Sequence, residues 1–221
     1  GADYGNYLMQ IDILRGNDIR GLGLRYQPLF FFILDGFIRL FEPFTALKVA
    51  GALVFSIITI PFFLLAKKLS GNTIAAGIST TLFVFFISYT EMISWGGNPN
   101  FLGFSFMLLA FAFLIEFFKK PSKKNILFSG LAISLVMGTH VLVAIFMFFS
   151  LFVFAILKIA FTTERKEKIK SNIPKFFFLL IAAAAFSLPY VSYYLTFIQN
   201  SASEMVGFRF FGFPLTTPIT I

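Results

Sequence analysis

The sequence predicts a polytopic, all-α membrane protein: a transmembrane bundle of about six helices, with amphipathic interfacial helices in its first outer loop. Three observations predict this fold. Of the 221 residues, 58% are hydrophobic and 13% are charged, against about 25% charged in soluble domains. The apolar residues fall in long runs, and the basic residues alternate from one side of these runs to the other. A soluble protein of this size would expose large apolar patches, so lipid is the expected solvent.

Residues 1–44 form the first predicted region, an outer loop that precedes the first complete span. Within this region, the apolar stretch of residues 27–41 is too short to span a membrane and carries Asp35 and Arg39. Because the sequence opens at Gly1 without an initiator Met or a signal peptide, we expect a truncated reading frame whose first helix is missing. An apolar stripe at helical spacing predicts one interfacial helix, on Tyr4, Tyr7, Leu8, Ile11 and Leu14.

Residues 45–221 form the predicted transmembrane domain, since a span needs about 20 predominantly apolar residues. The run 126–161 is too long for one span, and we expect a short helix and a full one separated near Gly138-Thr139-His140. The alternative is a single long tilted helix. Pro61 and Pro189 each predict a kink inside a span. The four other expected spans are residues 46–66, 73–89, 101–118 and 174–197.

The charges predict the orientation. One side of the spans carries twelve of the eighteen basic residues and three acidic ones, a net charge of +9. The opposite side carries six basic and seven acidic residues, a net charge of −1. The positive-inside rule places the lysine-rich side in the cytoplasm. The total of +8 is therefore not a nucleic-acid footprint. We expect a multi-pass protein of the cell membrane, with membrane lipids and no nucleic acid among its partners.

The order of the outer residues is informative beyond composition. An acidic residue, Asp3, opens the loop, an amphipathic helix ends near Asn17-Asp18, and Gln27-Pro28-Leu29 leads into an aromatic helix. Over residues 1–140 this order resembles the GT-C superfamily of membrane glycosyltransferases. The resemblance is closest to the protein O-mannosyltransferase and lipid A aminoarabinose-transferase branch. Two departures are a short stretch after Asp18 and Gln27 in place of a second Pro or a Lys-Pro pair.

The resemblance implies a glycosyltransferase with its active site on the extracytoplasmic side. Its donor would be a polyprenyl-phosphate-linked sugar, and its acceptor a lipid, a glycan or a protein. Asp3 would be the catalytic base that takes the acceptor's proton in one inverting displacement. The alternative role for Asp3 is an N-cap of the helix that follows it.

The next outer loop contributes the expected sugar site, Glu91 and Trp95, although Trp95 is also typical of an interfacial anchor. Asn98 and Asn100 stand where oligosaccharyltransferase catalytic subunits carry an acidic pair that binds a divalent metal. Neutral amides are poor ligands for a hard cation, so we expect no cofactor and favour a metal-independent site over a divalent-metal site. Asn98 before Pro99 also fits a helix cap followed by a first turn.

Three further residues are candidates for substrate binding. His140 lies at a predicted outer turn, where an ionisable residue near the membrane is a functional candidate. A histidine that is simply hydrogen-bonded in a helix turn is the equal alternative. Arg39 and Lys48 could hold the phosphate of a lipid leaving group, although such residues more often only extend toward the interface. We expect Asp3, Glu91 and His140 to surround one cavity.

Two other classes of function compete with the transferase. A transporter or a lipid or polysaccharide flippase component would carry ionisable residues deep within its spans and broken helices in two symmetric halves. Here the predicted mid-span regions are nearly free of charge. A purely structural membrane subunit is the third interpretation, but it does not explain why carboxylates gather on the outer side.

Overall fold

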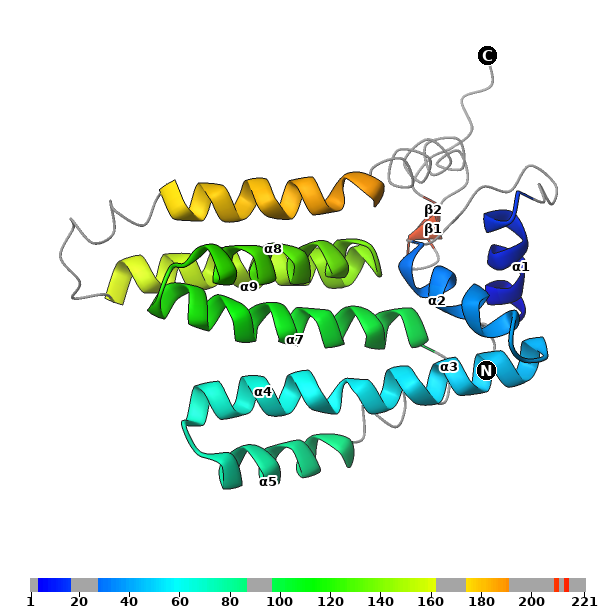
Figure 1. Ribbon diagram of the computed structural model, residues 1–221, viewed down its shortest axis with the longest axis horizontal. Helices are drawn as coiled ribbons and strands as arrows, with labels where there is room; N and C mark the ends of the chain where they lie inside the picture. The colour runs from blue at the N-terminus through cyan, green and yellow to red at the C-terminus, as the bar shows by residue number, and fades with distance from the viewer. Residues whose placement is uncertain are drawn as a thin grey trace, which may run out of the picture.

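The computed structural model of the protein describes residues 4–16, 28–86, 97–161, 174–190, 209–210 and 213–214. Long helices lie side by side in a bundle in this part of the chain, and two shorter helices lie across one of its ends (Figure 1). The helices α3 and α4 run in one direction, and each later helix of the bundle reverses direction. The bundle consists of α3 (Pro43–Ile57), α4 (Thr59–Ser70), α5 (Thr73–Val84), α7 (Asn98–Lys119), α8 (Lys123–Met137), α9 (Val141–Phe161) and the helix Pro174–Tyr190.

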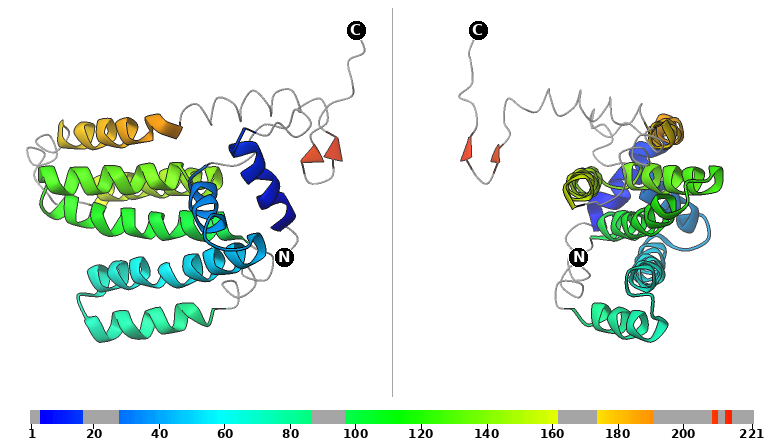
Figure 2. Two further views of the ribbon diagram at one scale, coloured as in Figure 1. Left: turned by 45° about the vertical axis from the view of Figure 1, so that its right-hand side comes forward. Right: turned by 90° about the vertical axis from the view of Figure 1, so that its left-hand side faces the viewer.

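The crossing helices are α1 (Tyr4–Leu14) and α2 (Leu29–Ile38), which lie where α3 and α7 begin (Figures 1 and 2). We call this the covered end. At the opposite end, the lysine-rich end, α4 meets α5 and α7 meets α8. The Tyr7 ring packs edge-on against Phe30 and Phe31, with centroid distances of 5.6 and 5.8 Å. These aromatic contacts hold α1 on α2. The predicted helix is confirmed, and Tyr7 and Ile11 of its apolar stripe are buried against the protein.

The first predicted span is interrupted. The helical stretch Pro43–Ser70 is continuous except at Ile58, three residues before Pro61. Proline has no N–H to donate to the preceding turn, so the helical hydrogen bonding fails there. The Thr59 hydroxyl instead donates to the carbonyl of Ser56 at 2.7 Å. The helix is interrupted one turn before Pro61, and the kinks predicted at Pro61 and Pro189 stay predictions.

The split of the long apolar run is confirmed. One helix ends at Met137, and the next begins at Val141. The Thr139 hydroxyl donates to the carbonyls of Leu135 and Val136, at 2.9 and 2.8 Å, and thereby satisfies acceptors at the end of α8. The run therefore folds as two antiparallel helices and not as one long tilted helix.

The prediction of a full span over residues 73–89 is wrong. The helix α5 ends at Val84, and residues 85 and 86 are not helical. Twelve residues rise about 18 Å, against a hydrocarbon thickness of about 30 Å. Aromatic and β-branched residues such as Phe83 and Val84 have low helix propensity, which favours this early end.

Two described helical stretches are long and apolar enough to cross a membrane, Pro43–Ser70 and Asn98–Lys119. The coarse prediction of a helical membrane fold is confirmed, whereas the count of six spans stays a prediction. The helical fold has one exception in the described residues, a two-residue antiparallel pair in which Arg209 of β1 (Arg209–Phe210) lies opposite Pro214 of β2 (Phe213–Pro214).

The helix α7 connects two apolar cores. Its first turns, at Phe101 and Leu102, pack into a core shared with α1, α2 and α3. Its second half, at Ala110 and Leu114, packs into a core shared with α8, α9 and the helix Pro174–Tyr190. The site described below lies at the covered end, next to the first of these cores.

Candidate functional site

The turn between α8 and α9 is fixed at the covered end by three neighbours. The N–H of Leu29, at the start of α2, donates to the Gly138 carbonyl at 3.0 Å. A Cβ on Gly138 would lie 2.6 Å from the ring of Tyr190, so only glycine leaves room for that ring. A Cβ on Gly103 of α7 would lie 3.3 Å from the Thr139 hydroxyl oxygen. Close approach of this kind brings α2, α7 and the turn together.

Asn98 stands at the start of α7 and is fully buried. The N-cap of this helix is Gly97, and its start has no side-chain capping hydrogen bond. The alternative that Asn98 caps the helix is therefore wrong. Its amide lies against α3, where a Cβ on Gly51 would be 3.4 Å from both the Oδ1 and the Nδ2 atoms. Neither atom has a hydrogen-bond partner among the described residues.

His140 follows the same pattern in the turn between α8 and α9. Its Nδ1 atom is buried and has no hydrogen-bond partner in the described part of the chain. Burial lowers the pKa of this imidazole below its usual value, because a desolvated ring disfavours the charged form. His140 is therefore neutral at pH 7, with one nitrogen that donates and one that accepts.

Asn100 adds a third unpartnered polar atom, its buried Oδ1. Asn100 lies three residues before Gly103 on α7, and residues at this spacing share a helix face. Gly103 faces Thr139, the neighbour of His140, so Asn100 lies on the side of α7 that faces this turn. Residues two positions apart on a helix do not share a face, so Asn98 lies toward α3 and Asn100 toward the turn. We call Asn98, Asn100 and His140, which carry buried unpartnered polar atoms at the covered end, the neutral polar site.

An unpartnered buried polar group costs about 1–3 kcal/mol, and native proteins contain few of them. Several such groups at one end of a bundle, all uncharged, are suited to hydrogen bonds with a neutral ligand. In the described residues, no group of three or more His, Cys, Asp or Glu side chains is placed to hold a metal ion.

Arg39 lies in an ion pair with a structural role. Its guanidinium donates to Asp35 at 3.0 and 3.1 Å, and Arg15 at the end of α1 donates to the same carboxylate at 2.7 Å. Burial alone would raise the pKa of Asp35, but the two arginines outweigh it and lower that pKa. The ion pair between Arg15 and Asp35 ties α1 to α2. Phosphate binding by Arg39 stays a prediction.

Lys48 lies exposed on α3, close to the cap of that helix. The N–H groups of Phe44 and Thr45 donate to Glu42 and lower the pKa of its carboxyl, and the charge of Lys48 lowers it further. Lys48 therefore faces water or a headgroup at the covered end, and a role in substrate binding stays a prediction.

The other predicted site residues, Asp3, Glu91 and Trp95, lie outside the described residues, so the shared cavity with His140 is untested. In the sequence, Asn98 and Asn100 stand out as replacements for metal ligands and Asn98 also as a helix cap, and no pattern predicts that the Asn98 amide is buried against Gly51. Two amides beside a proline in so apolar a chain were the available signal.

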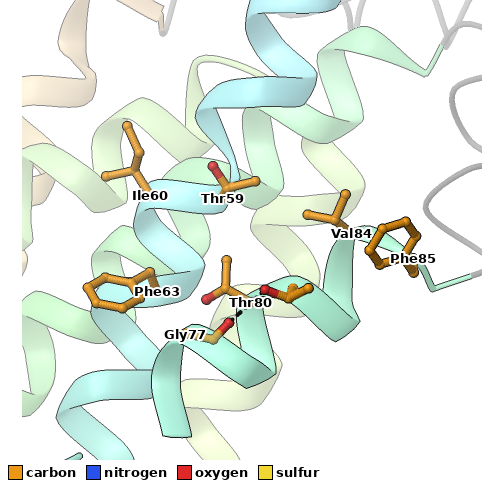
Figure 3. A pocket seen from close by; sticks show the side chains of 8 residues that line it. Thr59, Ile60, Phe63, Gly77, Thr80, Val84 and Phe85 are labelled. Carbon is orange, nitrogen blue, oxygen red and sulfur yellow. Dashed lines mark hydrogen bonds between the residues drawn. The ribbon is translucent and has the colours of Figure 1, made fainter. Parts of the chain in front are cut away.

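A groove between α4 and α5 is a second candidate (Figure 3). It has a volume of about 460 Å³ and is open at the surface. The hydroxyls of Thr59, Thr80 and Thr81 line it, but each donates to a backbone carbonyl three or four residues earlier in the chain, at 2.7, 2.8 and 3.0 Å. The groove therefore offers apolar surface and few free polar groups, unlike the neutral polar site.

Comparison with known proteins corrects the functional prediction. Residues 24–218 match the model of the family described as "6-pyruvoyl-tetrahydropterin synthase related domain; membrane protein". No curated protein and no solved structure matches the chain. The resemblance to the GT-C superfamily is wrong, and so is the prediction of a glycosyltransferase, because the matching family is a different one. The match covers most of the 221 residues, and the chain therefore belongs to the 6-pyruvoyl-tetrahydropterin synthase related family of membrane proteins.

Proposed function

We propose that the protein is a multi-pass membrane transporter component, of the lipid flippase type, that binds the uncharged polar head of an amphiphilic substrate at its covered end. The single observation that carries this proposal is the neutral polar site: buried polar atoms of Asn98, Asn100 and His140 that have no hydrogen-bond partner among the described residues.

The chemistry of the site favours a neutral head group. An amide both donates and accepts hydrogen bonds, and so does a neutral imidazole. A hydroxyl-rich or amide-bearing head group could satisfy such atoms, and each bond would be strengthened by the low local dielectric. Of the described basic side chains at the covered end, Arg15 and Arg39 are already paired with Asp35, which makes this end less suited to a phosphate than to a neutral head group.

The distribution of charge supports passive movement over ion-coupled transport. In the described residues, the middle of each bundle helix carries no acidic or basic side chain. Ion-coupled transporters place such groups within their spans. This distribution favours movement of a substrate down its own gradient.

The orientation is part of the proposal. The described lysines other than Lys48 lie at the lysine-rich end, which the positive-inside rule assigns to the cytoplasm. The neutral polar site then faces the extracytoplasmic side. The direction alternates from α3–α4 through α5, α7, α8, α9 and the helix Pro174–Tyr190 (Figure 1). A sixth pass at α5 would need residues beyond this twelve-residue helix, which alone is too short to cross. Single cysteines placed at Lys123 and Lys48 of this cysteine-free chain test the orientation, since an impermeant reagent should label only position 48 in intact cells.

A flipping assay tests the function directly. The protein is reconstituted in liposomes that contain fluorescent glucosylceramide or, in parallel, fluorescent phosphatidylglycerol, and dithionite quenching measures transbilayer movement. We expect faster movement of the neutral sugar-headed lipid and little effect on the anionic one. Asn98→Leu should slow the movement roughly 10-fold or more, because it removes both hydrogen-bonding atoms.

The matched control is Ser105→Ala. Ser105 is buried one to two turns further along α7, but its hydroxyl donates to the Phe101 carbonyl at 2.8 Å, so it has no donor left for a ligand. This variant should flip lipid as fast as the wild type. Movement no faster than in protein-free liposomes, for both lipids, would refute the proposed function.

A further inference from the structure

The turn between α7 and α8 at the lysine-rich end is held rigidly by its own side chains. The Asn125 side-chain amide donates to the Lys120 carbonyl at 2.8 Å, and the N–H of Lys120 donates to the Glu116 carbonyl at 2.8 Å. The Ser122 hydroxyl caps α8 by accepting the N–H of Asn125 at 3.2 Å. The ends of both helices are therefore satisfied, and the turn presents its remaining side chains from a fixed backbone.

Those side chains are mainly lysines. The turn contributes exposed residues from the last positions of α7 and the first of α8, and the neighbouring α4–α5 turn contributes another exposed lysine: they are Lys67, Lys119, Lys120, Lys123 and Lys124. The only acid among the described residues of this end is Glu116, and Lys68 neutralises it through a 2.7 Å ion pair. The pair also joins α4 to α7, so the two turns form one positively charged surface. We call these five exposed lysines the lysine patch.

The lysine patch lies at the depth of lipid head groups. The helix α7, which is long and apolar enough to cross a membrane, ends at Lys119. Large apolar side chains are exposed within about one turn of the lysines on α8, at Leu127 and Phe128, and one helical turn spans about 5.4 Å. The Lys124 ammonium lies 5.8 Å from the centre of the Phe128 ring. Exposed apolar rings directly beside ammonium groups are typical of a membrane interface.

We propose that the lysine patch is a binding surface for the head groups of anionic phospholipids. The proposal does not depend on the transport function, because it concerns the opposite end of the bundle. The phosphate of a lipid complements several ammonium groups at once, and anionic lipids attract lysines near a membrane surface. The rigid turn reduces the entropy that the protein loses on binding. The apolar neighbours select a lipid over a free phosphate, because they contact the acyl chains.

Native mass spectrometry of the full chain in detergent tests the proposal, with dioctanoyl phosphatidylglycerol and dioctanoyl phosphatidylcholine as probes. We expect the anionic lipid to bind roughly 10-fold or more tightly. Replacement of Lys119, Lys120, Lys123 and Lys124 by glutamine should remove this preference. The matched variant with arginine at the same four positions keeps the charge and should keep the preference.

Further measurements separate the outcomes. In the wild-type protein, the preference for the anionic lipid should fall as the salt concentration rises. This measurement does not depend on whether a variant folds. Arg15→Gln, which removes a positive charge at the covered end that is paired with Asp35, should leave the preference intact. Equal binding of the two lipids, or a preference that survives the glutamine changes, would overturn the proposal. Displacement of the lipid by inorganic phosphate at equal concentration would assign the patch to a soluble anion and would also overturn it.

Discussion

The two ends of the helical bundle differ in whether their polar groups have hydrogen-bond partners. At the lysine-rich end the helix ends are satisfied by their own side chains, as when Asn125 binds the Lys120 carbonyl and Asn72 caps α5. The charges there are exposed or paired. At the covered end, polar atoms of Asn98 and His140 are buried and have no partner among the described residues.

This difference indicates that a ligand site for buried polar groups should lie at the covered end. A satisfied helix end stabilises the fold and leaves no unpaired backbone group for a ligand, whereas unpartnered buried groups lower stability unless something binds them. The helices α1 and α2, which we call the roof, cross the covered end, and a few identifiable contacts attach them. These are the Asp35 ion pairs and the hydrogen bond from Leu29 to Gly138.

The largest expected effect concerns the packing of the covered end. Gly138→Ala places a Cβ 2.6 Å from the Tyr190 ring and should lower the free energy of unfolding by about 1–3 kcal/mol, as overpacking does. Gly36→Ala on α2 is the control, because no atom lies within 4 Å of its Cβ position. That variant should be neutral or slightly stabilising. Thermal unfolding in detergent measures both, and equal melting temperatures would contradict the close packing of the turn.

The attachment of the roof gives the second prediction. Asp35→Asn removes the carboxylate shared by Arg15 and Arg39. The Arg39 side chain is largely exposed and that of Arg15 partly exposed, at 73% and 39%, so we expect a loss of only about 1 kcal/mol in unfolding free energy. The pKa of Asp35 is lowered in the folded protein, so its contribution is complete above the unfolded pKa of about 3.9 and is lost as pH falls below it. Chemical unfolding at pH 7 and pH 3 checks this, and the variant should lose its disadvantage at the lower pH.

A smaller effect is expected from His140, the single histidine of the chain. Burial lowers its pKa in the folded state, so below about pH 6.5 the unfolded chain binds a proton that the folded protein does not. Stability should therefore fall as pH drops from 7 toward 5. His140→Gln should flatten this dependence, as measured by melting temperature across the range. An equally steep fall in the variant would show that another group titrates.

The smallest effect is expected at the lysine-rich end. The ion pair between Lys68 and Glu116 is partly exposed, with side-chain exposures of 25% and 40%. Such pairs contribute about 0–1 kcal/mol. A double-mutant cycle with Lys68→Gln and Glu116→Gln should give a coupling energy in this range. A much larger coupling would mean that this end, too, stores energy in buried polar contacts.

Much of the fold followed from local patterns in the sequence. The helix Tyr4–Leu14 and the turn at Gly138 were predicted because hydropathy and glycine act on a few neighbouring residues. The length of α5 was overestimated, since apolar residues continue past Val84 although the helix does not. Hydropathy indicates whether a segment lies in an apolar or an aqueous environment. It does not indicate where the helical hydrogen bonding of that segment ends.

The candidate site and the protein family were harder to predict from the sequence than the fold was. The burial of Asn98 depends on Gly51, which lies 47 positions earlier in the chain on another helix, and the pairing of Arg15 with Asp35 joins residues 20 positions apart. No local pattern specifies such contacts. The resemblance to the GT-C superfamily relied on the order of helices and loops, and the membrane imposes similar orders on proteins of different families.

The central claim is that the protein keeps the buried amide of Asn98 for a ligand, at the expense of stability. The most direct test is the thermal stability of Asn98→Leu in detergent without added lipid, with Ser105→Ala measured beside it. A leucine is close in shape and removes both unpartnered atoms. It should raise the free energy of unfolding by about 1–3 kcal/mol, while Ser105→Ala should lower it slightly or leave it unchanged. If Asn98→Leu instead melts below the wild type, the amide is a structural group and the site is not built for a ligand.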